Sequence, residues 1–284
     1  MKEITIQRDG ITKQLQSIRN SKSPGPEGIP ARVLKELAPQ IAPFLEIIFK
    51  KSLSEGKIPI DWKIANVTPI FKKGNRHDPG NYRPISLTSI IGKILEHIVV
   101  SNIMTFLDSR NFLHGSQHGF RKGRSCETQL ALFLHDVLKS GESKRQVDAL
   151  FLDFKKAFDT VPHNKLIHKL QSCGLNGTVV NWIRDFLSDR KQKVVLDGIS
   201  SDVVKVTSGV PQGSVIGPLL FIIYINDLCS RISSKIRLFA DDAVIYREIS
   251  DHSDFEILSS DLNNVHVWSQ EWGLELNLSK CTAV

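Results

Sequence analysis

Apolar residues in the first third of the chain recur with the spacing typical of helices. The pattern predicts one helix in "ITKQLQSIRN" and another in "ARVLKELAPQIAPFLEIIFKKSLSEG", interrupted at Pro39 and Pro43 and ending near Gly56. The alternation in "ANVTPIFKKG" predicts a strand that runs into a loop rich in Gly, Asn, Pro and basic residues. The amphipathic stretch "TSIIGKILEHIVVSNIMTFLDSR" predicts a further, long helix.

The pattern changes near the middle of the chain. The stretch "HGSQHGFRKGRSCETQLALFLHDVLKSG" predicts a basic loop and then a helix that Ser125 caps and Gly141 ends. The nearly continuous apolar run "VDALFLDF" is typical of a strand at the centre of a sheet. Two predicted helices follow, "HNKLIHKLQSCG" and "GTVVNWIRDFLSD", and then a predicted hairpin, "QKVVLDGISSDVVKV", which turns at Asp197 and Gly198.

The last part of the chain combines helices with strands. It contains the loop "TSGVPQGS", the apolar helix "PLLFIIYINDL", the hairpin "IRLFADDAVIY", a helix to about Trp272 and a last strand "LELNL". We therefore expect the α+β class, with a mainly helical N-terminal region in residues 1–145. Residues 146–284 should then form an antiparallel sheet packed with helices.

Composition is ordinary for a globular protein with a substantial core, because 41% of the 284 residues are hydrophobic and 24% are charged. The 37 Lys and Arg residues exceed the 30 acidic ones and give a net charge of +7. This excess favours a polyanionic partner, although many other enzymes are equally basic.

The cysteines and the apolar runs limit the cellular setting. The cysteines show no C-x-x-C spacing, which argues against a zinc ribbon and a dense disulfide framework and favours a reduced intracellular compartment. The longest continuous apolar runs, such as "PLLFIIYI", are too short to span a bilayer, and the N-terminus lacks a signal-peptide pattern. We therefore expect a soluble protein without a membrane partner.

Two adjacent carboxylates, Asp241 and Asp242, lie between apolar runs in "LFADDAVIY". Burying them unpaired would cost several kcal/mol, so they are either solvated in a turn, the commoner case for a bare Asp-Asp pair, or paired with a cation. Asp153 also ends an apolar strand, and it would meet Asp241 at one sheet edge if the two strands are neighbours. Side chains alternate between faces, so Asp241 and Asp242 can both approach Asp153 only if a tight turn intervenes. Such an edge would offer oxygen ligands suited to Mg²⁺.

Eight motifs together resemble the reverse transcriptases of non-LTR (LINE-type) retrotransposons. Four of them are "FADD", "LFLDFKKAFDTVPH", "SGVPQGSVIGPLLFIIYINDL" and "NYRPISLTSIIGKILEHI". The others are "KSPGPEGIPARVLKEL", "ANVTPIFKKG", "QHGFRKGRSCETQL" and "WGLELNLSKC". They stand in the family's order and cover nearly the whole chain after about residue 10, which makes the resemblance specific.

The resemblance implies a right-handed polymerase with fingers in residues 1–145, together with part of the palm, and the catalytic palm motifs in residues 146–284. Family members continue beyond the position of "KCTAV" into the rest of the palm and a thumb, and the chain has no endonuclease region before "MKEITIQRDG". We therefore expect a fragment without a thumb, from a truncated genomic copy or a partial gene.

The resemblance also implies roles for residues of the second half. Asp153 and Asp241 would bind two catalytic Mg²⁺ ions, for which Mn²⁺ could substitute, and Asp242 would complete the acidic cluster. Phe158 matches the aromatic residue beneath the incoming sugar that selects deoxynucleotides, although a core aromatic is the alternative. Lys280 matches a possible general acid.

Other residues match positions that contact the nucleotide or the nucleic acid. Lys72 and Arg83 would contact the triphosphate, with Lys73 or a plain surface lysine as the alternative to Lys72. The loop "SGVPQGS" matches a loop that packs against template and nucleotide, or it is an ordinary turn; its matched residues are Ser208, Gly209, Gln212 and Gly213. A basic cluster could hold phosphates of the template and primer, or it is a solvated face; it comprises Arg121, Lys122 and Arg124.

These matches predict an RNA-directed DNA polymerase that uses an RNA template, a DNA primer and deoxynucleoside triphosphates. The alternative is a truncated, inactive remnant that only binds nucleic acid, which the net charge of +7 would also explain. A primer-independent RNA polymerase is disfavoured by Phe158 and the motif set. By resemblance alone, we expect a location associated with the nucleus.

Overall fold

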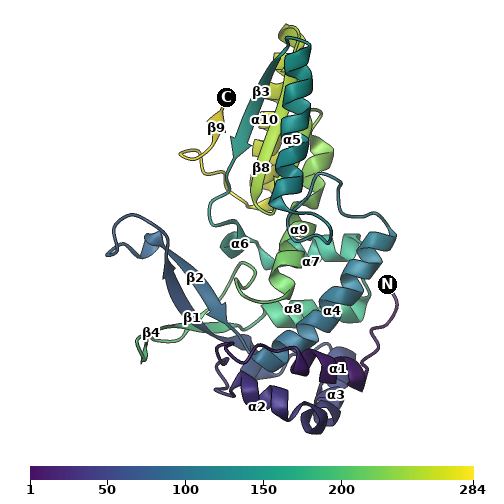
Figure 1. Ribbon diagram of the computed structural model, residues 1–284, viewed down its shortest axis with the longest axis vertical. Coiled ribbons are helices and arrows are strands. Elements are labelled where there is room, and N and C mark those ends of the chain that lie inside the picture. The colour runs from purple at the N-terminus through teal and green to yellow at the C-terminus, as the bar shows by residue number, and fades with distance from the viewer. The chain divides into compact units, whose positions relative to one another are not determined.

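The computed structural model describes residues 1–284, which divide into two compact units (Figure 1). The first unit consists of Met1–Phe106 and Ile167–Gly217, and the second unit of Leu107–Leu166 and Pro218–Val284. Each unit combines helices with a β-sheet, so the expected mixture of helices and strands is confirmed at the level of fold class. The division of the chain near residue 145 stays a prediction.

Helices account for most of the chain before residue 110 and for several later segments. The α-helices are α1 (Arg8–Gln16), α2 (Ala31–Glu36), α3 (Ala38–Glu55), α4 (Ile90–Ser109), α5 (Cys126–Glu142), α6 (Ala157–Thr160), α7 (His163–Ser172), α8 (Gly177–Leu187), α9 (Ile216–Ile225) and α10 (His252–Trp272). Short 3₁₀ turns occur at Ile60–Lys63, Pro79–Asn81 and Asn226–Arg231.

The prolines and glycines of the first helices act only partly as predicted. The chain breaks at Leu37, between α2 and α3, which places Pro39 in the first turn of α3, where its missing N–H costs no hydrogen bond. Pro43 lies inside α3, and the predicted interruption there is wrong. Gly56 ends the helix in the left-handed region, with φ of 61°, and the N–H of Lys57 bonds to the carbonyl of Ser52 (3.0 Å).

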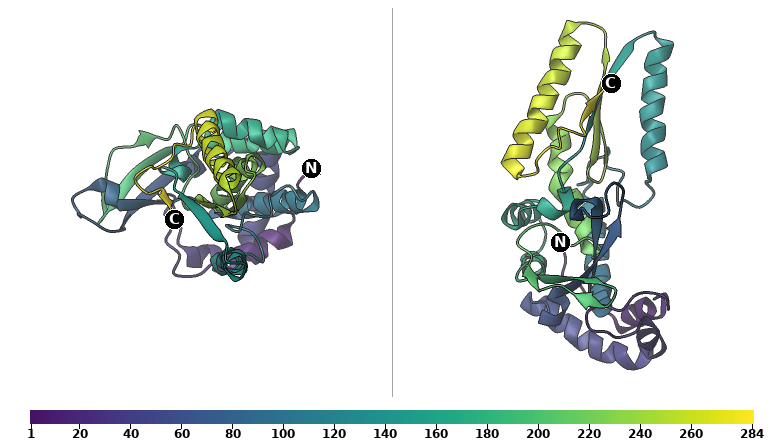
Figure 2. Two further views of the ribbon diagram at one scale, coloured as in Figure 1. Left: turned by 90° about the horizontal axis from the view of Figure 1, so that it is seen from above. Right: turned by 90° about the vertical axis from the view of Figure 1, so that its left-hand side faces the viewer.

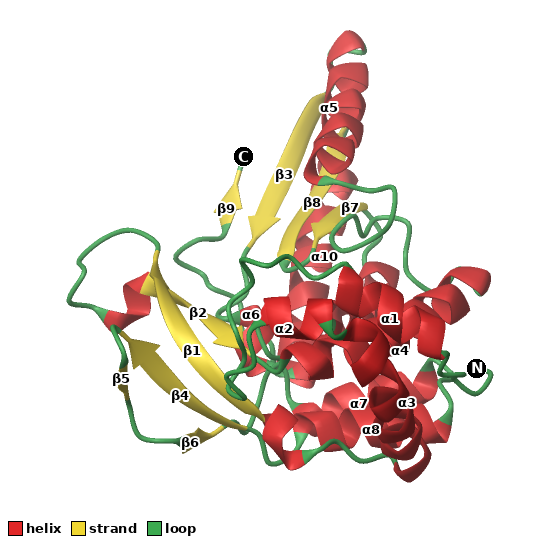
Figure 3. Cartoon of the chain, turned by 60° about the horizontal axis from the view of Figure 1, so that its bottom comes forward, coloured by secondary structure: helices red, strands yellow, loops and turns green.

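The sheet of the first unit is mixed and joins strands from both predicted regions, whereas the sequence predicted a sheet, antiparallel, only in residues 146–284. Its strands are β1 (Ile64–Phe71), β2 (Tyr82–Leu87), β4 (Lys191–Leu196), β5 (Ile199–Ser200) and β6 (Val204–Lys205). Figure 3 shows β2, β1 and β4 side by side, in the order β2-β1-β4-β5, with β6 also paired to β4. β1 and β2 are antiparallel, but β1 and β4 are parallel. The predicted hairpin turn at Asp197 and Gly198 is confirmed, because both residues have positive φ (49° and 82°).

The second unit contains the predicted antiparallel sheet. Its strands are β3 (Gln146–Leu152), β7 (Lys235–Phe239), β8 (Asp242–Ile249) and β9 (Thr282–Ala283), in the order β7-β8-β3-β9. The apolar run "VDALFLDF" forms β3 at an inner position, and "IRLFADDAVIY" forms the hairpin of β7 and β8. The predicted strand "LELNL" is wrong: it forms a single bridge at Leu276, and the last strand comes later, as β9.

Helices α5 and α10 lie on opposite faces of this sheet (Figure 2). Ser125 caps α5 as predicted, although the helix runs one residue beyond Gly141. On the α5 face, the ring of Phe133 contacts the ring of Tyr246 in an edge-to-face arrangement, with ring centroids 4.9 Å apart. On the other side, Trp268 of α10 is fully buried. Both faces of the sheet are therefore covered, which fixes the positions of the strand ends.

A polar network ties α5 to the β7–β8 hairpin. The carboxylate of Asp136 accepts hydrogen bonds from the side chains of Tyr246 (2.5 Å), Lys235 (2.7 Å) and Arg237 (3.0 Å). Burial opposes ionisation of Asp136, but these hydrogen bonds outweigh it and lower its pKa to about 2. Asp136 therefore stays ionised and holds both strands of the hairpin at neutral pH.

One helix, α4, is long and apolar enough to cross a membrane by length and composition alone, which the continuous apolar runs did not indicate. Leu95, Val99, Ile103 and Leu107, spaced four residues apart, are fully buried inside the protein. Because buried core helices also meet these criteria, α4 gives only weak support for a membrane segment. The expectation of no membrane partner stays a prediction.

Candidate active site

Two of the three predicted catalytic carboxylates face each other at one edge of the second unit's sheet. β3 and β8 pair antiparallel, and their last register pair is Leu152 with Ala243. One step further along the same register, Asp153 lies opposite Asp242. Directly opposed residues of antiparallel strands point to the same face, with Cβ atoms about 5 Å apart. The strand register therefore brings Asp153 and Asp242 together.

The two carboxylates repel each other. Burial raises the pKa of Asp242, the negative charge of Asp153 raises it further, and Lys280 partly offsets both effects. One oxygen of Asp153 accepts a hydrogen bond from the side-chain amide of Asn277 (2.8 Å) and forms an ion pair with Lys280 (3.3 Å). The pair is thus only partly neutralised by the chain's own groups, and a further cation at this edge would stabilise it.

Asp241 lies in the turn of the β7–β8 hairpin. The last register pair is Phe239 with Asp242, which leaves Ala240 and Asp241 as a two-residue loop. Ala240 has φ of 56°, the left-handed conformation that such hairpin loops require. The sequence predicted that a tight turn would bring Asp241 and Asp242 to the edge where Asp153 lies. The structure has this turn, with Asp242 as the residue directly opposite Asp153.

The donor set fits a magnesium ion that takes part of its coordination from a substrate. Carboxylate oxygens are the ligands that Mg²⁺ prefers, and it usually binds through one or two carboxylates together with waters and substrate phosphates. Within residues 1–284, no group of three or more His, Cys, Asp or Glu side chains forms a complete metal cage by itself. The facing carboxylates of Asp153 and Asp242 match a site in which two carboxylates bind Mg²⁺ together with waters and substrate phosphates.

A segment that the sequence assigned only to a basic loop and to a family motif holds the hairpin turn in place. The backbone of Ser116–Gly119 pairs with β7: Leu238 donates to the carbonyl of Ser116 (2.9 Å), and His118 donates to the carbonyl of Leu238 (2.8 Å). The buried side-chain oxygen of Gln117 accepts hydrogen bonds from the N–H groups of Ala240 (3.0 Å) and Gly119 (2.8 Å). We call Ser116–Gly119 the turn clamp.

Gly119 has no room for a side chain. A Cβ atom there would lie 2.4 Å from the backbone nitrogen of Ala240 and 3.1 Å from its Cα. The glycine therefore permits the close approach of the turn clamp to the loop that carries Asp241. The signal in the sequence is the Gln-x-Gly spacing in "QHGFRKG", a segment of one family motif in which only the basic residues had been given a role.

Phe158 lies in α6 and is half-buried between two other rings. Its ring stacks on Phe221, with centroids 4.3 Å apart and an interplanar angle of 18°. The ring of Phe120 meets it edge-on at 6.2 Å. Phe120 directly follows the turn clamp, is 54% exposed and has φ of 56°, which is unusual for a bulky residue. Packing on Phe221 fits the core alternative, and the partial exposure leaves Phe158 available to a ligand.

The basic cluster after the turn clamp is partly engaged in holding the loop. Arg121 donates to the carbonyls of Leu113 (3.2 Å) and His114 (3.1 Å). Arg124 donates to the carbonyls of Gly115 and Gln117. Lys122 is exposed. Contacts of this cluster with template or primer therefore stay a prediction, and the structure leaves Lys122 the freest of the three.

The segment that contains Asn277 and Lys280 is anchored on Asp153. The N–H of Asn277 donates to the carbonyl of Asp153 (2.7 Å), in addition to the side-chain hydrogen bond described above. Lys280 is mostly exposed and lies in a turn closed by a hydrogen bond from its N–H to the carbonyl of Asn277 (2.9 Å). The sequence singled out Lys280 but missed Asn277, which orients Asp153.

The predicted triphosphate contacts lie in the first unit, on the β1–β2 hairpin. The register pairs Ile70 with Arg83, and the N–H of Lys72 bonds to the carbonyl of Asn81 (2.9 Å), which continues the ladder. Residues two apart on a strand point to the same face, so the ladder hydrogen bond places Lys72 on the face of Arg83, whereas Lys73 lies in the bend beyond the ladder. Of the two lysines left open by the sequence, Lys72 is the one placed beside Arg83.

The "SGVPQGS" loop is fixed against β2 in the same unit. Ser86 of β2 donates its N–H to the carbonyl of Gln212 (2.8 Å), and a Cβ atom at Gly213 would lie 2.5 Å from the carbonyl oxygen of Ser86. Gly209 and Gly213 both have positive φ (82° and 110°), and Ser208 lies in the same loop. Gln212 and Gly213 thus lie beside the strand that carries Arg83.

Buried Glu96 of α4 anchors the end of this loop. One of its carboxylate oxygens accepts hydrogen bonds from the N–H groups of Val215 (2.6 Å) and Ile216 (3.1 Å), at the start of α9. Burial raises the pKa of Glu96, although these two hydrogen bonds oppose the rise. The second half of the loop is therefore held both by β2 and by α4.

Comparison with known proteins identifies the class of this fold and site. A family model described as "Reverse transcriptase (RNA-dependent DNA polymerase)" matches residues 70–284. The chain is 30% identical over 272 residues to the probable RNA-directed DNA polymerase from transposon X-element of Drosophila melanogaster, covering 93% of this chain and 30% of that protein. It is 30% identical over 273 residues to the RNA-directed DNA polymerase from mobile element jockey of the same species, with the same coverage.

A more distant relative is the Pol polyprotein of the retrotransposable element R2 of Popillia japonica, 25% identical over 246 residues, which cover 82% of this chain and 33% of that protein. The chain belongs to the reverse transcriptase family. Its relatives come from non-LTR retrotransposons, as the eight motifs predicted. The chain spans about three tenths of the length of its X-element and jockey relatives.

Proposed function

We propose that the chain catalyses RNA-directed DNA synthesis, the addition of deoxynucleoside monophosphates from deoxynucleoside triphosphates to a primer 3′-end on an RNA template. The observation that carries the proposal is the facing of Asp153 and Asp242 where β3 and β8 meet, in a chain of the reverse transcriptase family. The proposed architecture places the palm in the sheet of the second unit and the fingers in the first unit. As an element-encoded enzyme of this kind, it would work in association with the nucleus.

Each side chain at the carboxylate edge has a proposed role. Asp153, Asp241 and Asp242 would hold divalent magnesium, which when bound supplies Lewis-acid activation of a hydroxyl and neutralises polyphosphate charge. Asn277 orients Asp153 through its amide hydrogen bond. Lys280 would be the general acid that donates a proton to the leaving pyrophosphate, because its ammonium group already lies at Asp153.

The contacts of the first unit would bind the charged part of the nucleotide. Lys72 and Arg83 present two cations on one face of a hairpin, which suits a triphosphate better than a single point charge does. Gln212 and Gly213 would contact the nucleotide, and Ser208 and Gly209 the template, from the loop fixed on β2.

The direct test is incorporation of deoxythymidine on poly(rA) with an oligo(dT) primer and Mg²⁺, comparing the chain with its Asp241→Asn variant. We expect incorporation by the parent chain and its loss in the variant. Binding of the same primer-template, followed by fluorescence anisotropy, should be the same for both. A chain that binds the primer-template but incorporates nothing with either Mg²⁺ or Mn²⁺ is a nucleic-acid-binding remnant, and that result contradicts the proposal.

Replacing Phe158 with Val should loosen the selection of sugars. If the ring lies beneath the incoming sugar, its removal makes room for a 2′-hydroxyl and lowers the preference for dTTP over UTP by about tenfold or more. The ratio of the two kcat/KM values is the measurement, because weaker packing on Phe221 would lower both values alike. Phe255→Ala, at an exposed ring on α10 in the same unit, is the matched control. An unchanged ratio would assign Phe158 to the core.

A further inference from the structure

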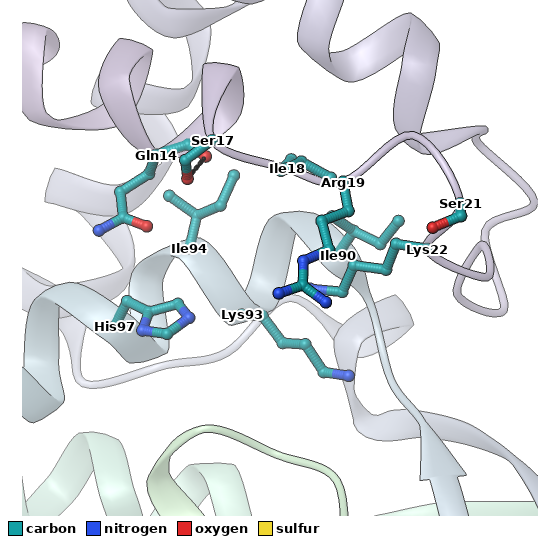
Figure 4. Close-up of a pocket in the computed structure, with 10 residues that line it drawn as sticks. All are labelled: Gln14, Ser17, Ile18, Arg19, Ser21, Lys22, Ile90, Lys93, Ile94 and His97. Carbon is teal, nitrogen blue, oxygen red and sulfur yellow. Dashed lines mark hydrogen bonds between the residues drawn. The ribbon is translucent and has the colours of Figure 1, made fainter.

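A cavity of about 470 Å³ lies in the first unit, outside the site described above, between the segment that follows α1 and the first turns of α4 (Figure 4). This volume is within the usual range of ligand pockets. Four of its lining residues are basic: Arg19, Lys22, Lys93 and His97. No acidic residue lines it.

The basic side chains come from two elements and are directed into one space. The N–H of Lys22 donates to the carbonyl of Arg19 (3.0 Å), which closes a turn with a cation at each end. Lys93 and His97 are one helical turn apart on α4 and therefore share a face. In Figure 4 the side chains of Arg19 and Lys93 extend toward the same part of the cavity.

None of these groups has an ion-pair partner. Glu27 and Glu96, whose charges act on Lys93, form no ion pair with it and accept hydrogen bonds from the backbone: Glu27 from the N–H of Ile90 (2.8 Å) and Glu96 from the N–H of Val215. Burial and then the charge of Lys22 lower the pKa of Lys93, an effect that Glu96 and Glu27 partly offset. Burial followed by the charges of Lys22 and Lys93 lowers the pKa of His97. The groups thus repel one another, and an anion between them would relieve the repulsion.

The N–H groups at the start of α4 would not be the main groups that hold an anion in this cavity. Two of the first N–H groups of the helix already have acceptors, because Glu27 accepts from Ile90 and the hydroxyl of Ser89 accepts from Gly92 (3.1 Å). An anion would therefore be held mainly by side chains and not by the helix end. The cavity also contains buried apolar side chains, Ile18 and Ile94, which suit the C–H surface of a sugar.

We propose that this cavity binds a backbone phosphate of a nucleic-acid strand, with the cations on the phosphate and the isoleucines against the adjoining sugar. Phosphate contacts of this kind fix a strand in position without reading its sequence. The identification of the strand as an RNA template rests on the proposed function. The net charge of +7 favours a polyanion over a free phosphate.

The test compares a double variant of the cavity, Arg19→Glu with Lys93→Glu, with a matched control, Arg32→Glu with Lys51→Glu. The control changes net charge equally, at residues of α2 and α3 outside the cavity lining. Binding of fluorescein-labelled oligo(rU) is measured by anisotropy over a range of salt concentrations. We expect the cavity variant to bind about tenfold more weakly, with a salt slope lower by about 0.7 for each phosphate that the cavity no longer neutralises. The control should keep the parent's slope.

Further measurements distinguish a strand-binding cavity from a bulk charge effect and from a free-anion pocket. Lys93→Gln, which removes the charge without reversing it, replaces the double variant if circular dichroism shows that the latter is unfolded. An equal decrease of oligo(rU) binding in the control would show a bulk charge effect and overturn the proposal. Binding of inorganic phosphate alone in calorimetry, with oligo(rU) binding unaffected by the cavity variant, would show a free-anion pocket and also overturn it. Labelled oligo(dT) tests whether the strand is RNA: equal dependence on the cavity supports backbone recognition of either strand.

The polymerase proposal can fail independently of this one. If the parent chain incorporates no nucleotide but its oligo(rU) binding depends on the cavity, the proposed function is contradicted and the cavity's role is supported. If the cavity variant incorporates deoxythymidine with the parent's KM for poly(rA) and the parent's affinity for oligo(rU), the polymerase proposal stands and the cavity's role is overturned.

Discussion

Asp153→Asn should abolish primer extension while leaving the fold intact. The substitution keeps the size of the side chain and its hydrogen-bonding partner Asn277 but removes the charge that faces Asp242. If Asp153 anchors a cation that stabilises the transferring phosphoryl group, the loss is several kcal/mol, which corresponds to about a thousandfold or more in rate. The measurement is single-turnover deoxythymidine incorporation on poly(rA) and oligo(dT).

The same variant should be at least as stable as the parent. Burial raises the pKa of Asp242 and the negative charge of Asp153 raises it further, so the two carboxylates repel each other. The ion pair of Asp153 with exposed Lys280 contributes little in solvent. Thermal unfolding should therefore show an unchanged or slightly higher midpoint. A carboxylate retained at a cost in stability is typical of a functional site.

Asp148→Asn is the matched control for this prediction. Asp148 lies on the same strand, β3, but five positions away, so its side chain points to the opposite face from that of Asp153. We expect parent-level extension from Asp148→Asn. If both variants lose activity equally, the effect comes from the strand and not from the facing carboxylates. If Asp153→Asn retains activity, the carboxylate edge is not the active site.

The β7–β8 hairpin could be predicted because its signals are local. Apolar flanks on both sides of Asp241 and Asp242 define two strands, and a two-residue connection leaves only a tight turn. The capping of α5 by Ser125 and the end of α3 at Gly56 are similarly local, since each depends on one residue and its neighbours in sequence.

Features that depend on distant segments were missed. The parallel pairing of β1 with β4 joins residues more than a hundred positions apart, and nothing in either strand indicates its partner. The failure at "LELNL" has a similar cause: this segment makes backbone hydrogen bonds to Asp153 and Lys155, through Asn277 and Glu275, and pairs only at Leu276. Local propensity cannot show such a tertiary contact.

The residues of the candidate site also differ in whether their role could be predicted from local sequence. Asp153, Asp241 and Asp242 were singled out because their charges interrupt apolar runs, and the family resemblance then assigned them metal-binding roles. Gln117 was not singled out, because a side-chain amide is common in exposed loops. Only the structure shows that Gln117 is buried and that its oxygen accepts a hydrogen bond from the N–H of Ala240 in the turn. The residues that hold a site in position therefore leave a weaker trace in sequence than those that carry its charge.

Gly119→Ala should reduce primer extension by about a hundredfold, as expected when reacting groups are displaced by about 1 Å. The new Cβ would lie 2.4 Å from the backbone nitrogen of Ala240, which is too close for any real contact, so either the turn clamp or the hairpin turn must move. The hydrogen bond from Ala240 to Gln117 would then lengthen, and the loop that carries Asp241 would lose its fixed conformation. Crowding of this kind costs stability of about 1–3 kcal/mol.

Gly115→Ala is the control for Gly119→Ala, because it adds the same methyl group four residues earlier in the same loop, where no atom lies within 4 Å of the new Cβ. Both variants are assayed well below their unfolding midpoints, so that a loss of rate beyond the unfolded fraction reports the position of the turn. Gln117→Met, which keeps the length of the side chain but removes its acceptor, should lower the rate in the same direction as Gly119→Ala. Parent-level extension by both Gly119→Ala and Gln117→Met would show that the carboxylates keep their places without the turn clamp, and would limit Ser116–Gly119 to a structural role in β7.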